Sequence, residues 1–175
     1  MVLIWTILNE PLVKGQLTTC PVTTVFDRIN SNENILYKLF NSGKTLQGIS
    51  GTQTYVIEII RGSTKPVLFW KIVQSIDNNG YYFYNSSNVY TLICRPELGG
   101  ICEDDVTPQP EGRFRFYPSS NAIERAKGLC NIQSTGRGWL SVDSSTNVVK
   151  VTSNQSDPSA VWMIVPYSLN KVPLF

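Results

Sequence analysis

Short runs of β-branched and aromatic residues make up most of this chain, and they limit its fold more than any other feature. Turn-forming residues separate the runs, for example NSGK at 41–44 and DNNG at 77–80. This alternation is typical of strands joined by tight turns. Helical periodicity is nearly absent, except in SSNAIERAKGLC at 119–130, where Ser120 is placed to cap one or two turns before Gly128. The pattern predicts an all-β protein of about ten to twelve short strands.

Two tryptophans indicate that the strands are repeated. Trp70 in LFWKI and Trp162 in AVWMI are 92 residues apart, which is twice 46, and Phe116 lies at the midpoint. A unit of this length accommodates four strands, and three such units form a β-trefoil. We therefore predict a single β-trefoil domain over residues 1–175, with three pseudo-repeats of about 46 residues at 25–70, 71–116 and 117–162. A β-sandwich and an eight-stranded barrel are the alternatives with a similar number of strands.

The composition excludes several classes of function. A net charge of +2 without clustered Lys and Arg is too weak for a nucleic-acid-binding surface. No apolar run is long enough to span a membrane. The chain contains 0 histidines, which removes Ser-His-Asp and Cys-His catalysis and histidine-bearing zinc sites. The acidic run at 103–105 is a weak calcium signal, and we interpret it as a solvated turn. We expect a protein that is not an enzyme and that has no metal or cofactor.

Four cysteines predict two disulfides, with unpaired buried thiols as the alternative. They are Cys20, Cys94, Cys102 and Cys130. Of the three possible connectivities, Cys94 with Cys102 and Cys20 with Cys130 are slightly preferred, because the short spacing of the first pair suits a hairpin clamp. Two glycosylation sequons, which begin at Asn85 and Asn154, agree with secretion. We expect a secreted or vacuolar protein.

Three stretches resemble the Kunitz-type protease inhibitors of the soybean trypsin inhibitor family. They are NEPLVKGQLTTCPVTTV at 9–25, YTLICRPELGGIC at 90–102 and GWLSVDSSTNVVKVTSNQSDPSAVWMI at 138–164, and together they cover about a third of the chain. The resemblance implies a β-trefoil with two disulfides that inhibits a protease, with the serine type favoured, through an exposed loop.

In such an inhibitor, a basic residue on a pre-ordered loop fills the specificity pocket of the protease. Lys44, with its neighbour Thr45, is the first candidate, because its separation from Cys20 is close to that found in the family. The alternative is a plain hairpin turn with a solvated lysine. Arg61 and Arg95 are rival candidates, and Pro96 and a Cys94–Cys102 disulfide would stiffen the segment around Arg95.

A carbohydrate-binding β-trefoil is the competing hypothesis, and glycans are then the partners. Four aromatic residues follow one another at 81–84, and strand alternation turns two of them outward. Tyr82 and Tyr84 are the candidates for stacking against sugar rings. The Gln-x-Trp signature of many such lectins is absent. A receptor-binding trefoil module is a third hypothesis, and no particular residue marks it.

Overall fold

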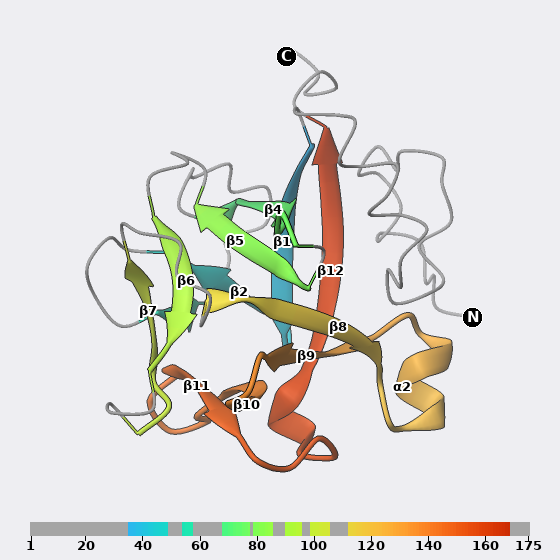
Figure 1. Cartoon of the computed structure of the whole chain (residues 1–175). Coiled ribbons are helices and arrows are strands. Elements are labelled where there is room, and N and C mark those ends of the chain that lie inside the picture. The colour runs from blue at the N-terminus through green and yellow to red at the C-terminus, as the bar shows by residue number, and fades with distance from the viewer. Residues whose placement is uncertain are drawn as a thin grey trace, which may run out of the picture.

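The computed structural model describes residues 35–48, 54–57, 68–77, 79–85, 90–95, 99–105 and 112–168. The motif at 9–25, Cys20 and Arg61 lie outside these residues. A sheet of 12 strands dominates the described part, so the all-β prediction is confirmed (Figure 1). The strands are β1 (Ile35–Asn41), β2 (Lys44–Gln47), β3 (Tyr55–Ile57), β4 (Trp70–Gln74), β5 (Tyr81–Asn85), β6 (Thr91–Cys94), β7 (Cys102–Asp105), β8 (Phe114–Pro118), β9 (Cys130–Ser134), β10 (Gly138–Val142), β11 (Val149–Thr152) and β12 (Val161–Ser168). Helix α2 (Ala122–Ala126) and the 3-10 helix η4 (Pro158–Ala160) complete the described elements.

Six strands pair in a closed ring and form a barrel. Going around it, β1 pairs with β4, β4 with β5, β5 with β8, β8 with β9, β9 with β12, and β12 with β1, all antiparallel. The β1–β12 pairing runs from Ile35 opposite Ser168 to Phe40 opposite Met163, and Figure 1 shows these two strands side by side. Because the ring closes, none of the six strands is left as a free sheet edge.

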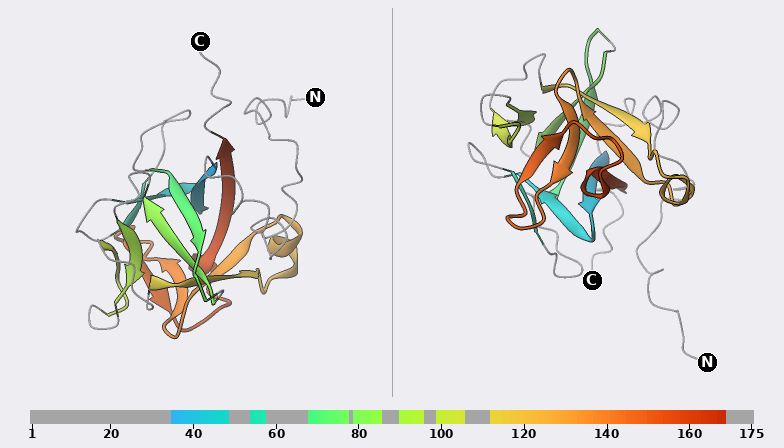
Figure 2. Two further views of the ribbon diagram at one scale, coloured as in Figure 1. Left: turned by 45° about the horizontal axis from the view of Figure 1, so that its top comes forward. Right: turned by 90° about the horizontal axis from the view of Figure 1, so that it is seen from below.

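Three hairpins, β2–β3, β6–β7 and β10–β11, bond to one another at one end of the barrel. The backbone N–H of Thr54, just before β3, donates to the carbonyl of Cys102 in β7. The N–H of Val149 in β11 donates in turn to the carbonyl of Thr54, and the N–H of Val151 donates to the carbonyl of Gly100. Seen from below, the orange β10–β11 hairpin lies across this end of the barrel (Figure 2, right).

Two tryptophans hold matching places in the core. Trp70 begins β4 and Trp162 lies near the start of β12, and both are 0% exposed. The indole N–H of Trp70 donates to the carbonyl of Leu46 in β2 at 3.3 Å. The indole N–H of Trp162 donates to the carbonyl of Leu140 in β10 at 2.8 Å. Each ring therefore fills the barrel interior and also ties a barrel strand to a hairpin strand.

The third core position of this kind belongs to Phe114, not to Phe116 as the even spacing predicted. Phe114 begins β8 and pairs with β5 and β9, just as Trp70 begins β4 and pairs with β1 and β5. It is 0% exposed, whereas Phe116 is partly buried against the core. Phe114 lies 44 residues after Trp70 and 48 before Trp162. The difference of two residues is one full strand period, so Phe116 still faces inward.

Two local predictions need correction. The helix in SSNAIERAKGLC is confirmed as α2, but its N-cap is Asn121 and not Ser120, because the Asn121 side chain accepts hydrogen bonds from the N–H groups of Ile123 and Glu124. The acidic run at 103–105 belongs to strand β7 and is not a turn. There its residues pair with β6, which explains why the backbone is extended.

The predicted clamp between Cys94 and Cys102 is confirmed. The two residues lie opposite each other on β6 and β7 with a Cα–Cα distance of 3.9 Å, and their sulfur atoms are bonded. Cys130 is buried at the start of β9 and is also disulfide-bonded. Its pairing with Cys20 stays a prediction, because Cys20 lies outside the described residues.

Replacing Trp162 by Phe should lower the free energy of unfolding by about 2 kcal/mol, because the substitution removes buried volume and the hydrogen bond to Leu140. Trp70→Phe should cost less, since its bond to Leu46 is longer. Trp139→Phe, at a half-buried position, is the control and should cost under about 1 kcal/mol. Urea denaturation measures all three. A loss for Trp139→Phe equal to that for Trp162→Phe would contradict the assigned role of the indole hydrogen bond.

Candidate functional site

Lys44, the first candidate for an inhibitory loop, lies at a tight hairpin turn. Asn41 pairs with Lys44, so Ser42 and Gly43 alone connect β1 to β2. Their φ angles are 49° and 80°, the left-handed values that a two-residue type I′ turn requires. The Lys44 ammonium donates to the side-chain oxygen of Asn147 at 2.6 Å. The turn is therefore compact, and the lysine is held against the β10–β11 hairpin.

Of the other residues proposed for an inhibitory loop, Thr45 and Arg95 belong to the described part of the chain. Thr45 was expected in an exposed loop, but it is 0% exposed inside β2, where it pairs with Phe40 and Ile57. Arg95 follows the disulfide clamp, and its backbone bonds to Ile101 and Gly100 close a short loop. Arg61 lies outside the described residues. A buried Thr45 cannot contact a protease while the fold is intact.

Tyr82 and Tyr84 form an aromatic pair on the outer side of β5. Phe83 between them is 0% exposed and stacks on Phe114, so the strand alternates as the sequence predicted. The rings of Tyr82 and Tyr84 are 6.4 Å apart in an edge-to-face arrangement. Burial raises the pKa of Tyr84, and the neighbouring Tyr82 adds to the effect. Lys71 and Val73 of β4 lie opposite the two tyrosines.

A second outward surface crosses four strands. Arg115 of β8 pairs with Gln133 of β9, Gln133 pairs with Trp139 of β10, and Trp139 pairs with Thr152 of β11. Residues directly opposite each other in antiparallel strands share a face, so the four side chains form one line across the sheet, and all four are half-buried. We call these four residues the cross-strand row. At the spacing of neighbouring strands it is roughly 14 Å long.

Tyr117 holds the middle of the cross-strand row in place. Its ring lies 5.3 Å from that of Trp139 in an edge-to-face contact. Its hydroxyl donates to the side-chain oxygen of Gln133 at 3.4 Å. On the same face, Asn131 is buried and donates to the carbonyls of Gln155 and Ala160, so the segment before β12 bounds the row. The row thus presents a fixed indole beside an amide and a hydroxyl.

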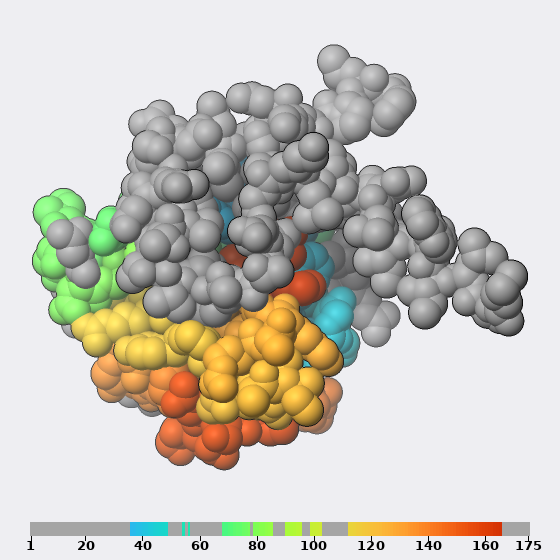
Figure 3. Space-filling model, turned by 90° about the vertical axis from the view of Figure 1, so that its right-hand side faces the viewer, coloured from blue at the N-terminus to red at the C-terminus, as the bar shows by residue number. Residues whose placement is uncertain are grey.

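Arg115, at one end of the row, contacts the turn between β4 and β5. Its Nε–H donates to the carbonyl of Asn79 at 3.4 Å, and Nη2 donates to the side-chain oxygen of the same residue. Arg113, two residues earlier in the chain, forms an ion pair with Asp77. Hydrogen bonds from Ser75 and then from Arg113 lower the pKa of Asp77 to about 2. Figure 3 shows β8 and α2, in yellow and light orange, as a broad part of the surface on one side.

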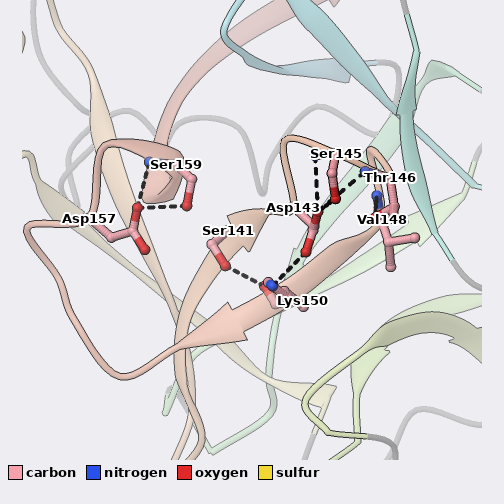
Figure 4. A network of polar contacts seen from close by, with 8 residues as sticks. All are labelled: Ser141, Asp143, Ser145, Thr146, Val148, Lys150, Asp157 and Ser159. Carbon is pink, nitrogen blue, oxygen red and sulfur yellow. Dashed lines mark hydrogen bonds and ion pairs between the residues drawn. The ribbon is translucent and has the colours of Figure 1, made fainter.

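Figure 4 shows a polar network around Asp143 and Lys150 in the β10–β11 hairpin and, apart from it, the contacts of Asp157 with Ser159 at the start of η4. One oxygen of Asp143 accepts from the Ser145 hydroxyl at 2.6 Å, from the Ser145 N–H at 3.0 Å and from the Thr146 N–H at 3.2 Å. Its other oxygen accepts from the Lys150 ammonium at 2.8 Å. The Lys150 ammonium first, and then Ser145 and Thr146, hold the pKa of Asp143 well below its usual range. Both oxygens of Asp143 are hydrogen-bonded within the hairpin, so we assign this network to structure.

The cross-strand row is the part of the candidate site that sequence reasoning missed. Alternation in GWLSV signals an outward Trp139, because Leu140 and Val142 on either side of Ser141 face the core. The pairing of Trp139 with Gln133 and Arg115 depends on strand register, which the sequence does not state.

The described residues set limits on other chemistry. Among them, no group of three or more His, Cys, Asp or Glu side chains is placed to hold a metal ion. The helices of this part of the chain are too short and too polar to cross a membrane.

Solved structures supply a comparison that the sequence alone does not. No protein-family model matches the chain, and no curated protein matches its sequence. The chain aligns over 77% of its length with the GlcNAcα1-4Gal-releasing endo-β-galactosidase from Clostridium perfringens, with a TM-score of 0.62 and 13% identity. It spans only 33% of that longer chain.

Two other similar structures are comparable in size to this chain. BEL, described as a β-trefoil, aligns with 77% of this chain and 94% of its own, with a TM-score of 0.61 and 12% identity. SeviL, solved bound to the asialo-GM1 saccharide, aligns with 74% of this chain and 95% of its own, with a TM-score of 0.58 and 13% identity. At these identities the likeness concerns the fold alone: an all-β closed barrel shared with β-trefoil proteins.

Replacing Asp143 by Asn should destabilise the protein at neutral pH and matter less in acid. The folded-state pKa of Asp143 lies below the ordinary value near 4, so its contribution is present above that pH and is lost as the pH falls below it. Urea midpoints of wild type and Asp143→Asn should therefore converge as the pH is lowered from about 5 to about 2. Lys150→Gln should weaken the pH dependence in the wild-type background. A constant difference between the two midpoints across this range would contradict the assignment.

Proposed function

We propose that this chain is a β-trefoil of three repeats of about 46 residues that binds carbohydrate at the cross-strand row. The observation that carries the proposal is the half-buried Trp139, fixed by Tyr117 and flanked by the Gln133 amide. A partly exposed indole that is held in one orientation loses little entropy when a ligand binds. The fold part of the proposal rests on the ring of strands, the three hairpins and the matched places of Trp70, Phe114 and Trp162.

The chemistry of the row suits a sugar. A pyranose ring has a face of C–H groups and a rim of hydroxyl groups, so it needs an aromatic surface and polar groups side by side. Trp139 supplies the surface. Gln133 uses its side-chain oxygen for Tyr117, and within the described residues its amide N–H groups have no partner. They are available to donate to sugar hydroxyls.

The similar structures support this proposal over protease inhibition. SeviL was solved with a saccharide, and the Clostridium perfringens enzyme is named for releasing one. The inhibitor hypothesis has less support, because Lys44 is held in a tight turn and Thr45 is buried. Tyr82 and Tyr84 remain a second candidate surface for the same function, since they also present paired rings to solvent.

The proposal includes secretion and binding without turnover. The Cys94–Cys102 disulfide persists most readily in an oxidising compartment. A chain with 0 histidines lacks the commonest general acid-base group. Of the two sequons, Asn154 is exposed in a turn, whereas Asn85 is 8% exposed at the end of β5.

A glycan array followed by calorimetry on the best ligand tests the proposal. Trp139→Ala should weaken binding by about tenfold or more, because it removes the stacking surface. Tyr82→Ala removes an aromatic side chain of similar exposure from β5 and is the matched control, which should keep the wild-type affinity. Thermal unfolding of each variant verifies that it is folded.

Two outcomes would contradict the assignment in different ways. Loss of binding in Tyr82→Ala but not in Trp139→Ala would move the site to β5. Inhibition of a trypsin-like protease without binding of any glycan would support the inhibitor hypothesis instead. The variants Lys44→Ala and Arg95→Ala would then locate the residue that contacts the protease.

A further inference from the structure

Arg115 gives the cross-strand row a charge that no described residue neutralises. Its neighbour Arg113 forms an ion pair with Asp77, whereas the contacts of Arg115 are with the neutral Asn79. The two contacts use Nε–H and one N–H of Nη2, so the remaining guanidinium N–H groups have no partner among the described residues. A positioned, uncompensated guanidinium at the end of an aromatic surface is suited to an anionic group.

Asn79 also fixes where this charge lies. Asn79 lies in the turn between β4 and β5, and the Ser75 hydroxyl stabilises this turn. The hydroxyl donates to Asp77 at 2.7 Å and accepts from the Asn79 N–H at 3.1 Å. Arg113 holds the same turn through Asp77. The Arg115 guanidinium is therefore held against this turn, and a ligand does not have to order it.

The distance along the row sets the size of the ligand. Arg115 on β8 and Trp139 on β10 are separated by one intervening strand, which places their backbones roughly 10 Å apart, and the Arg115 guanidinium is held at the turn between β4 and β5. A single sugar ring does not reach from one to the other. A ligand that stacks on Trp139 and contacts Arg115 has to be an oligosaccharide with its anionic group on a neighbouring unit.

We propose that the cross-strand row binds acidic oligosaccharides, with a sugar ring on Trp139, hydroxyl groups at Gln133 and a carboxylate or sulfate at Arg115. This inference rests on the proposed function and adds to it the class of ligand. The net charge of only +2 means that general attraction for polyanions is weak. Preference for an acidic sugar has to come from this local contact.

The test compares charged and neutral forms of the same saccharide by calorimetry in low salt. Trigalacturonic acid and its methyl ester form the carboxylate pair. A sulfated carrageenan tetrasaccharide and its desulfated form make the sulfate pair. In at least one pair the wild-type protein should bind the charged form about tenfold more tightly, and the preference should shrink as salt is added. The pair that shows the preference identifies the anionic group.

Variants separate the local contact from net charge. Arg115→Gln should abolish the preference and keep binding of the neutral form, while Arg115→Lys should retain part of it because the charge remains. Lys127→Gln, at an exposed position after α2, makes the same change in net charge and should leave the preference intact.

The inference and the proposed function fail in different ways. Equal affinity for charged and neutral forms, or a preference that survives Arg115→Gln, overturns the inference, and binding of neutral glycans that is lost in Trp139→Ala still supports the function. Binding of no saccharide by the wild-type protein overturns both.

Discussion

The interior of a closed barrel has to be filled by side chains, and this requirement organises the rest of the structure. Trp70, Phe114 and Trp162 do so from three barrel strands, and all are 0% exposed. Large rings in these places hold β4, β8 and β12 at a fixed separation. The two indole N–H groups then bind carbonyls of β2 and β10, so packing of the interior also positions the hairpins.

Much of the fold could be predicted from the sequence because local chemistry specifies it. Turn residues separate the strands, β-branched and aromatic residues fill them, and the NSGK stretch forms the tight turn that its Gly43 allows. The spacing of Trp70 and Trp162 also points to equivalent strands. The midpoint of that spacing is Phe116, whereas the fully buried ring of β8 is Phe114, which lies 44 residues after Trp70 and 48 before Trp162. Loop length changes at low energetic cost, so an average period does not fix a register.

The candidate site was harder to predict, since its residues come from strands whose pairing is a tertiary property. The outward placement of Tyr82 and Tyr84 follows from alternation within one strand. The association of Arg115 with Trp139 requires β8, β9 and β10 in one register, and a shift of one residue would turn Arg115 inward. The burial of Thr45 was also not predictable from the sequence. A residue next to a turn is exposed or buried according to the elements that pack over it, and Thr45 is 0% exposed.

The antiparallel pairing of β1 with β12 has a mechanical consequence. Ile35 lies opposite Ser168, so the chain enters β1 and leaves β12 at the same end of the pair. A pulling force applied along the chain before residue 35 and after residue 168 is directed across the strands, parallel to their hydrogen bonds. In this unzipping geometry the hydrogen bonds break one after another. In shear, with the force along the strands, they would share the load. A barrel held shut in this way resists heat and denaturant through its packed interior, yet it opens at its seam under a small force.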